Sequence, residues 1–285
     1  MSDTLRQRSH QSRMRPSTSL IIATYNWPAA LDVILRSVRA QRTMPDEVLI
    51  ADDGSGEATR LVIVAHQTDF PVPLKHVWHE DRGFRLAAIR NEAIRQAQGD
   101  YILQVDGDIV LHPRFVEQHI AQARPGSYVQ GSRCMLSRER TERMLRERNP
   151  RVPLLGRGLK NRLNALYCPL LAPLVGGPRD PDRRTRGCHM AFWRQDLLMV
   201  NGYDERFEGW GREDSELAAR LIHAGVQRRN HKFGAVAYHL WHPEATRAAF
   251  PANHAIYLET IALQSRRCAT GLVRPAGARE LLVGV

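Results

Sequence analysis

The sequence predicts an α/β fold with a mostly parallel central sheet flanked by helices. Short β-rich runs alternate with amphipathic helical patterns from Ser19 to Gly131. This order is typical of parallel strands with helices on both faces of the sheet. The 285 residues, of which 43% are hydrophobic and 25% charged, are enough to bury one large core. We therefore expect a globular chain built around a single main sheet.

The individual elements follow from periodicity and from turn residues. The first predicted helix places Leu31, Leu35 and Val38 on one face, and Pro28 suits its first turn. Gly99 ends the third predicted helix. The predicted strands are residues 20–23, 47–51, 74–78, 101–105 and 128–131, and the predicted helices are residues 28–41, 57–67, 86–98 and 113–123.

The alternation lapses after Gly131 and resumes near residue 188, across a segment interrupted by prolines. A segment of that length without regular structure is typical of a functional, membrane-facing or disordered insertion. Beyond it we expect strands at 188–193 and 235–239 and helices at 196–200 and 214–224. The predicted organisation is a disordered basic tail (1–17), a first subdomain (18–132), a basic insertion (133–186), a second subdomain (187–265) and a C-terminal tail (266–285).

Positive charge is concentrated in the insertion. The whole chain carries a net charge of +11, and residues 133–186 hold 14 Arg or Lys against 5 Asp or Glu. A basic block can attract nucleic acid, anionic lipid or phosphorylated small molecules. Two apolar stretches, Val152-Pro-Leu-Leu and Leu163 to Leu174, lie among the arginines of this block, which favours a membrane-surface patch. A solvated segment without a partner is the alternative.

Several classes of protein are not supported by the sequence. No apolar run approaches the roughly 18 residues of a transmembrane helix. The basic N-terminus lacks the apolar region of a secretory signal. The four cysteines are far apart and form no zinc or disulfide pattern. We therefore expect a cytoplasmic protein, and the basic insertion adds the hypothesis of peripheral binding to the inner membrane face.

Polar clusters follow three of the predicted strands, namely Thr24-Tyr-Asn26, Asp52-Asp-Gly-Ser55 and Asp106-Gly-Asp108. The carboxyl ends of parallel strands meet at one edge, where open α/β sheets bind ligands. Two carboxylates separated by one residue suit a hard divalent cation that shares its oxygen ligands with a diphosphate. Tyr25 can stack on a nucleobase, and Asp53 can accept a hydrogen bond from a pyrimidine N–H. Each cluster alone is equally typical of a polar turn, but their coincidence at one edge favours a binding site.

Two arginines precede the third cluster in a helical segment. Arg85 and Arg90 could supply positive charge to a diphosphate, although lone arginines on a helix are usually solvated. A glycine-rich dinucleotide fingerprint and a P-loop lysine are both absent from the sequence. If a nucleotide binds at this edge, carboxylate and aromatic side chains recognise it.

The segment Gly209-Trp-Gly-Arg-Glu-Asp214 combines an aromatic platform with carboxylates. Its two glycines permit a tight turn that presents Trp210 to a sugar ring. Glu213 or Asp214 could act as a general base toward an acceptor hydroxyl. The alternative is that both only stabilise the start of a helix.

The segment His239-Leu-Trp-His242 ends a predicted strand. A neutral imidazole there can complete a metal site begun by a carboxylate that is distant in sequence. His239 and His242 can face one ion only if a turn separates them. A purely structural role for either histidine is the alternative.

Together these segments resemble glycosyltransferase family 2, whose members have the GT-A type nucleotide-sugar-binding fold. The resemblance rests on Ser19 to Asn26, Ile50 to Ser55, Gly83 to Asn91 and the DxD-like Asp106-Gly-Asp108. The later part, from Arg186 to about His242, is similar to the C-terminal segment of β-1,4-galactosyltransferases and bacterial chondroitin-type polymerases. The resemblance as a whole implies a nucleotide-sugar-binding subdomain at 18–132 and an acceptor and metal subdomain at 187–265.

The resemblance implies an inverting, metal-dependent transfer of a hexose or N-acetylhexosamine from a UDP-sugar to a glycan. The basic insertion suggests a lipid-linked acceptor in surface polysaccharide or lipopolysaccharide synthesis. The implied nucleotide-sugar ligands are Thr24, Tyr25, Asp53, Arg85 and Asp106; the implied Mn²⁺ or Mg²⁺ ligands are Asp108 and His242, with Asp106 and His239 as further candidates; Trp210 and Glu213 bind the acceptor, and Asp214 is the catalytic base.

Two departures limit what carries over. Arg212 stands where the galactosyltransferases usually have a small residue, and His239 where they have a methionine ligand, so donor and acceptor identity are not copied. A nucleotidyltransferase would also use an acidic metal site but has no need of the Trp210 motif. A nucleic-acid-binding protein driven by the arginine block would show salt-sensitive binding; we expect no nucleic-acid partner.

Overall fold

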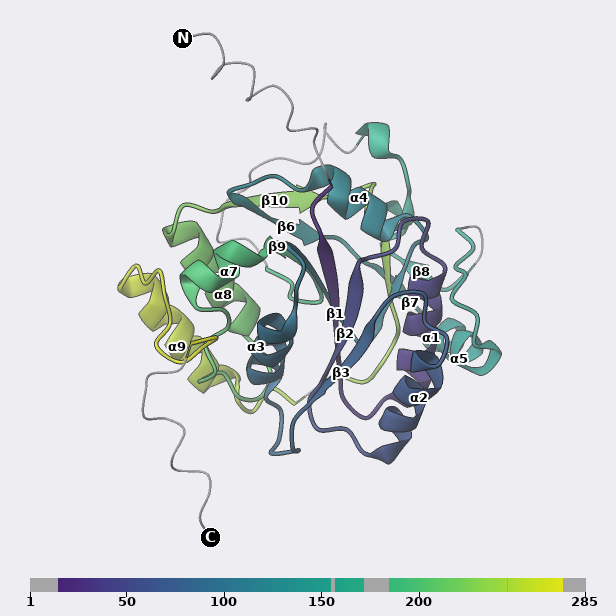
Figure 1. Ribbon diagram of the computed structural model, residues 1–285, viewed down its shortest axis with the longest axis horizontal. Helices are drawn as coiled ribbons and strands as arrows, with labels where there is room; N and C mark the ends of the chain where they lie inside the picture. Colours follow the sequence, from purple (N-terminus) through teal and green to yellow (C-terminus); the bar gives the residue numbers. More distant parts are fainter. Residues whose placement is uncertain (1–14, 155–156, 172–184, 245, 274–285) are drawn as a thin grey trace.

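The computed structural model describes residues 15–154, 157–171, 185–244 and 246–273 (Figure 1). A seven-stranded sheet in the order β10-β6-β9-β4-β1-β2-β3 forms its centre. Its strands are β1 (Thr18–Thr24), β2 (Glu47–Asp52), β3 (Leu74–Trp78), β4 (Tyr101–Asp106), β6 (Ser127–Gly131), β9 (His189–Trp193) and β10 (Gln227–His231). All neighbouring pairs are parallel except β9, which is antiparallel to β4 and β6. The predicted mostly parallel α/β sheet is confirmed.

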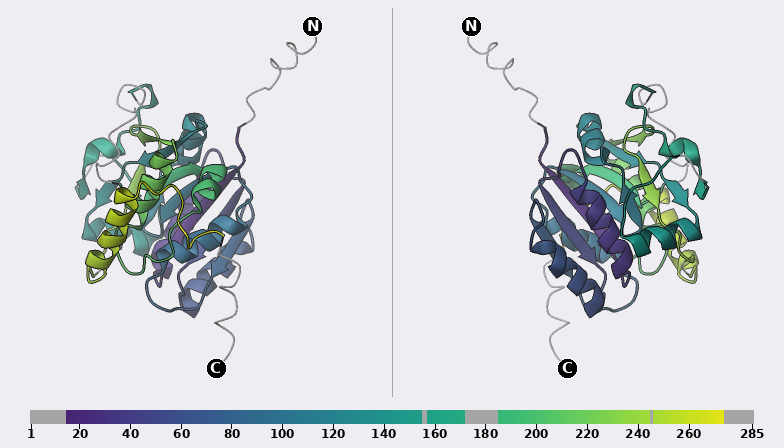
Figure 2. Two further views of the ribbon diagram at one scale, coloured as in Figure 1. Left: turned by 90° about the vertical axis from the view of Figure 1, so that its left-hand side faces the viewer. Right: turned by 90° about the vertical axis from the view of Figure 1, so that its right-hand side faces the viewer.

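Helices cover both faces of this sheet (Figures 1 and 2). On β1 the alternating side chains divide between the faces: Leu20 and Ile22 belong to one core, and Ile21 and Ala23 to the other. The first core contains α1 (Pro28–Arg39), α2 (Glu57–Gln67), α4 (Phe115–Gln122) and α5 (Arg138–Glu147), and the second contains α3 (Leu86–Gln96), α7 (Arg194–Val200) and α8 (Glu213–His223). Because the strands are buried on both faces, they read as continuous apolar runs.

A second, four-stranded sheet packs against the first core. Its order is β5-β11-β7-β8, with β5 (Ile109–Leu111), β11 (Ala237–His239), β7 (Cys134–Leu136) and β8 (Leu159–Lys160). β11 pairs with β5 directly after the Asp106-Gly-Asp108 turn. This pairing brings the end of the second subdomain to the edge of the main sheet.

Parts of the predicted insertion are more regular than expected. β7, α5, β8 and two 3₁₀ turns, η1 (Arg162–Ala165) and η2 (Pro169–Leu171), lie between residues 133 and 171. Helix α5 escaped prediction because only Thr141 and Met144 of its residues are buried, which leaves almost no apolar stripe. Residues 1–14, 155–156, 172–184 and 274–285, which include most of both predicted tails, lie outside the described residues.

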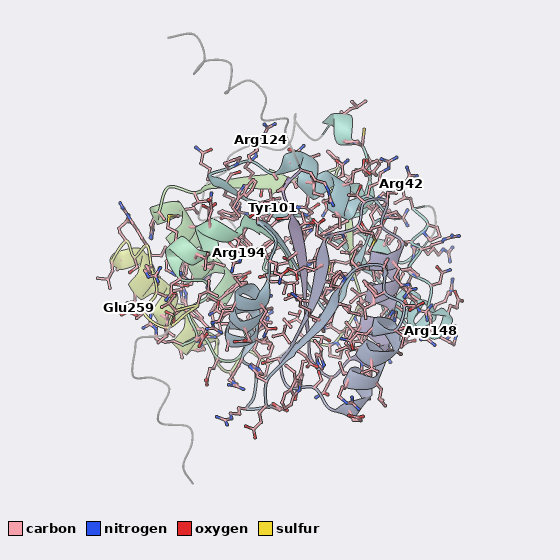
Figure 3. All side chains as sticks on the ribbon, in the orientation of Figure 1. Arg42, Tyr101, Arg124, Arg148, Arg194 and Glu259 are labelled. Carbon is pink, nitrogen blue, oxygen red and sulfur yellow. The ribbon has the colours of Figure 1, made fainter. Side chains whose placement is uncertain are left out.

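Two further elements were not predicted. Strand β10 has the polar sequence QRRNH and is recognisable only through its pairing with β6. Helix α9 (Phe250–Ala262) packs beside α8 and has buried residues only at Asn253 and Thr260. No helix within the described residues is long and apolar enough to cross a membrane. Figure 3 places Arg42 and Arg124 at the periphery, so basic side chains are not confined to the insertion.

Candidate active site

The three predicted polar clusters meet at one edge of the main sheet. In the parallel registers Thr24 lies opposite Asp52, and Ala23 lies opposite Asp106. The ends of β1, β2 and β4 are therefore adjacent, as the alternation of strands and helices predicted. The Oγ1 atom of Thr24 is buried at this edge and has no hydrogen-bond partner in the described part of the chain.

The central glycine of Asp106-Gly-Asp108 is required by close packing. A Cβ atom at Gly107 would lie 2.6 Å from the carbonyl oxygen of Ala23 and 3.2 Å from Thr24. Because a backbone atom cannot yield easily, a side chain at this position would push the turn away from β1. The glycine thus holds the two flanking carboxylates against the sheet edge.

Asp108, His239 and His242 form a compact cluster of candidate metal ligands. One ligand atom from each lies within 4.8 Å of the others. Asp108 Oδ2 is 3.1 Å from His239 Nε2 and 2.9 Å from His242 Nε2. The backbone N–H of Leu240 donates to the carbonyl of Asp108, so β11 is fixed next to this turn. Strand β11 ends at His239, and the Nε2 atoms of both histidines face the carboxylate of Asp108.

The chemistry of this cluster fits a divalent cation. Asp108 Oδ1 and His239 Nδ1 are buried and have no hydrogen-bond partner among the described residues. Burial works to raise the pKa of Asp108, but hydrogen bonds from His239 and His242 hold it below its usual range. An ionised carboxylate beside two imidazoles is a suitable donor set for Mn²⁺, and Asp106 could add a second carboxylate.

Arg90 joins the two halves of the site. Its Nη2 donates to Asp106 at 2.6 Å, and its Nη1 lies 3.5 Å from Glu213. The side chain is only 1% exposed, so the alternative of a solvated arginine on a helix does not apply to it. Its guanidinium also lies over the ring of Tyr203, 5.3 Å from the centroid. A buried arginine fixed by two carboxylates is positioned to orient Asp106 rather than to bind a ligand alone.

The predicted nucleoside-binding residues lie around the end of β2. Asp53 is buried, with Oδ1 2.6 Å from His79 Nε2 and Oδ2 accepting from the backbone N–H of Arg85. The Arg85 side chain donates to the carbonyl of Glu80, so it braces the loop before α3. Tyr25 is half exposed, and its hydroxyl donates to Asp81 at 2.9 Å. His79 and Asp81 carried no sequence signal, because their role depends on contacts across this loop.

Asp214 lies at the start of α8 with both carboxylate oxygens engaged. Oδ2 accepts from the backbone N–H of Gly187, and Oδ1 accepts from the backbone N–H of Ser215 at 2.6 Å. These contacts fix the orientation of the side chain. In the neighbouring position, burial raises the pKa of Glu213 to about 7, and the charge of Asp214 adds to the shift.

The loop before Asp214 is pressed against the start of α9. A Cβ atom at Gly209 would lie 2.5 Å from that of Ala249, and the backbone N–H of Gly209 donates to the carbonyl of Phe84. Trp210 is 39% exposed, and its ring centroid is 6.0 Å from that of Phe250. The structure therefore presents Trp210 as an accessible aromatic surface, three residues before Glu213 and four before Asp214 along the chain.

Comparison with known proteins identifies the family. Residues 19–175, more than half of the chain, match the profile of Glycosyl transferase family 2. The chain belongs to glycosyltransferase family 2. Residues 176–243 of this glycosyltransferase also match the profile described as the N-terminal domain of galactosyltransferase. The enzyme class and the two-part resemblance seen in the sequence are confirmed.

Curated relatives of the glycosyltransferase share 28–31% identity. Chondroitin synthase of Escherichia coli is 28% identical over 78% of the chain, and validoxylamine A glucosyltransferase of Streptomyces hygroscopicus subsp. limoneus is 31% identical over 74%. The matched regions are 34% and 49% of those proteins, so the chain spans at most about half the length of these relatives. Their activities as whole proteins are not transferred to this chain.

Solved structures support the GT-A fold. S. aureus TarS 1-349 in complex with UDP has a TM-score of 0.61 at 16% identity, covering 87% of this chain and 65% of that chain. Mannosyltransferase PcManGT from Pyrobaculum calidifontis, in complex with GDP-Man and Mn²⁺, has a TM-score of 0.59 at 20% identity, covering 90% and 66%. At these identities the likeness establishes the fold of the glycosyltransferase alone.

Sequence reasoning missed one more charged side chain near the candidate metal cluster. Arg133 Nη1 lies 2.7 Å from Cys188 Sγ, and its positive charge interacts with Asp106 and Asp108. It was counted only as part of the basic insertion. Its position beside the carboxylates makes it a candidate for neutralising a bound diphosphate in this glycosyltransferase.

Proposed function

We propose that the protein is an inverting, metal-dependent glycosyltransferase that moves a hexose or N-acetylhexosamine from a UDP-sugar to a glycan. The observation that carries this proposal is the Asp108, His239 and His242 cluster at the sheet edge. Asp106, in the same turn as Asp108, forms an ion pair with Arg90. Arg90 in turn contacts Glu213 at the start of α8, next to Asp214. This connection supports a donor site and an acceptor site that adjoin each other.

We assign the residues of the site to three roles: nucleoside binding, metal binding, and activation and positioning of the acceptor. Thr24, Tyr25 and Asp53, with Arg85 bracing their loop, surround the nucleoside position. Asp108 and His242 would hold Mn²⁺ or Mg²⁺, with Asp106 and His239 as further ligands, and the bound cation would stabilise the charge of the departing diphosphate. Asp214 accepts the proton of the acceptor hydroxyl, while Glu213 and Trp210 position the acceptor sugar.

Removal of metal from this glycosyltransferase is expected to abolish nucleotide-sugar turnover. The test is UDP release from UDP-glucose, UDP-galactose, UDP-N-acetylglucosamine and UDP-N-acetylgalactosamine, measured with Mn²⁺ and again after treatment with EDTA. GDP-mannose serves as the competing donor. We expect release from at least one UDP-sugar with Mn²⁺ and almost none with EDTA. Folded protein that turns over no donor under either condition would contradict the proposal.

The comparisons favour neither rival function. A nucleotidyltransferase would release pyrophosphate instead of UDP. A nucleic-acid-binding protein would retain salt-sensitive binding after Asp108 is substituted. Pyrophosphate release and nucleic-acid binding can both be measured on the same protein samples.

We further propose that the basic insertion docks on an anionic membrane and that the acceptor is lipid-linked. Leu163 is 68% exposed and Leu170 is 87% exposed, and both belong to the 3₁₀ turns of the insertion. Arg162 precedes Leu163, and both leucines belong to the basic insertion; apolar residues in a basic segment are typical of peptides that bind the surface of anionic bilayers. η2, which precedes one of the grey traces, projects from the body at the top of Figure 1.

Vesicle flotation tests this docking. The intact chain is expected to float with vesicles of phosphatidylglycerol and phosphatidylcholine, and not with phosphatidylcholine alone. Replacing Leu163 and Leu170 by serine should weaken flotation at least tenfold, since each buried leucine contributes on the order of 1.5 kcal/mol. Leu263→Ser is the matched control, because Leu263 is equally exposed at 68% but lies at the end of α9. Absence of flotation by the intact protein would remove the membrane from the proposal.

A further inference from the structure

A row of aromatic rings leads away from the proposed acceptor site along α9. Phe250, His254 and Tyr257 recur at helical spacing on one face of this helix. The ring centroids of Phe250 and His254 are 5.6 Å apart, and those of His254 and Tyr257 are 6.0 Å apart, with nearly parallel planes. Trp210 continues the row at 6.0 Å from Phe250. Aromatic faces of this kind suit the apolar faces of sugar rings.

Arg212 places a positive charge on this row. Its guanidinium carbon lies 5.4 Å from the ring centroid of Phe250 and 4.9 Å from that of Tyr257. No carboxylate is paired with it among the described residues, and its Nε is buried without a hydrogen-bond partner. Arg212 precedes the proposed base Asp214 by two residues. An arginine without a counter-ion is thus available next to the acceptor position.

The backbone at Arg212 shows that an arginine is not the conformationally easiest residue here. Its φ is +76°, in the left-handed region where a glycine is favoured and other residues are strained by roughly 1 kcal/mol. Since a glycine would relieve the strain, the side chain of Arg212 must contribute something that a small residue cannot.

The second arginine of this region differs in its environment. Arg247 lies over Trp210, 5.3 Å from the ring centroid, but its Nη2 is 2.9 Å from the carboxylate of Glu244. Its charge is therefore neutralised locally, and both partners are exposed. Of the two cations that contact the aromatic row, Arg212 is the one that lacks a counter-ion.

We propose that Arg212 selects an acidic acceptor glycan. The acceptor sugar lies with its apolar face on Trp210 and Phe250, and an anionic substituent on it receives hydrogen bonds from the Arg212 guanidinium. A uronic acid carboxylate and a phosphate ester share this chemistry. The proposal rests on the proposed function, because it names the acceptor class of the same site. Arg212 is a specificity-determining residue and takes no part in proton transfer.

A structural role for Arg212 makes a different prediction. If its guanidinium only fastened the loop to α9 through its contacts with the two rings, its removal would lower thermal stability and weaken all acceptors alike. Arg212→Met keeps much of the apolar contact and removes the charge. Arg212→Lys keeps the charge and loses the planar fork.

The test measures binding of matched glycosides by saturation-transfer NMR, with UDP and Mn²⁺ present. Methyl glycosides of glucose, galactose and mannose are each compared with the corresponding uronide and 6-phosphate. We expect at least one acidic compound to bind at least tenfold more tightly than its neutral partner. In Arg212→Met this preference should disappear while the neutral partner binds as before, and Arg212→Lys should restore part of it. Arg247→Met, the matched control, should keep the preference.

The contrast between uronides and 6-phosphates identifies the source of the anionic group. Equal binding of every acidic and neutral pair by the unsubstituted protein, or no binding of any acidic compound at 10 mM, would overturn the inference. A preference that survives Arg212→Met would also overturn it. UDP binding and UDP release are measured on the same samples: their absence counts against the glycosyltransferase function itself, whereas their presence with unselective glycoside binding counts against the role of Arg212 alone.

Discussion

Asp108→Asn is expected to lower kcat/KM for sugar transfer by about three orders of magnitude, the several kcal/mol that a bound cation contributes to leaving-group stabilisation. The asparagine keeps the shape of the side chain and an oxygen that can face His239 and His242. It removes the charge that a divalent cation requires. The fold should therefore survive while the affinity for Mn²⁺ falls.

Two measurements separate these effects. Manganese affinity is measured by electron paramagnetic resonance, and turnover by UDP release with Mn²⁺ in excess. Asp69→Asn is the control, because Asp69 is an exposed carboxylate paired with Arg39 on the α1–α2 side of the molecule. It should behave as the unsubstituted enzyme. Full activity of Asp108→Asn at low Mn²⁺ would show that the cluster is not the metal site.

The edge of the main sheet where β1, β2 and β4 end was predictable, because its position depends on local sequence. Continuous apolar runs ending in polar turns determine where β1, β2 and β4 stop, and parallel pairing then brings their ends together. The sequence therefore predicted that Thr24, Asp53 and Asp106 share one edge. Helix α5 and strand β10 escaped prediction because both are dominated by charged and polar residues: α5 has few apolar side chains to mark its buried face, and β10 is recognisable only from its pairing with β6.

The contacts between the two subdomains were not predictable from local pattern. Arg90 and Glu213 are 123 residues apart in the chain, and nothing in either segment indicates that they meet. Arg90 is buried where α3 meets Asp106, Tyr203 and Glu213 at the start of α8. The aromatic row of α9 was not predictable either, because its proximity to Trp210 depends on a contact between segments that are distant in sequence. Motif spacing identified the parts of the site, and the folded chain supplies their connections.

Substitution of the proposed base has the second large expected effect. Asp214→Asn should reduce kcat by a factor of about 10²–10⁴, the range contributed by a positioned general base. UDP-sugar binding should be almost unchanged, because the proposed role of Asp214 is toward the acceptor and its contacts are with Gly187 and Ser215. Single-turnover UDP release and the UDP dissociation constant are the two measurements. Equal losses in binding and turnover would indicate a structural role for Asp214.

Glu213→Gln is the informative companion variant. Because burial raises the pKa of Glu213 to about 7, a large fraction of this side chain is protonated near neutral pH, and glutamine resembles the protonated form. We expect a loss smaller than that of Asp214→Asn, seen mainly in the acceptor KM, since the proposed role of Glu213 is to position the acceptor sugar. If Glu213→Gln instead lost kcat as severely as Asp214→Asn while keeping acceptor KM, the base would have to be reassigned to Glu213.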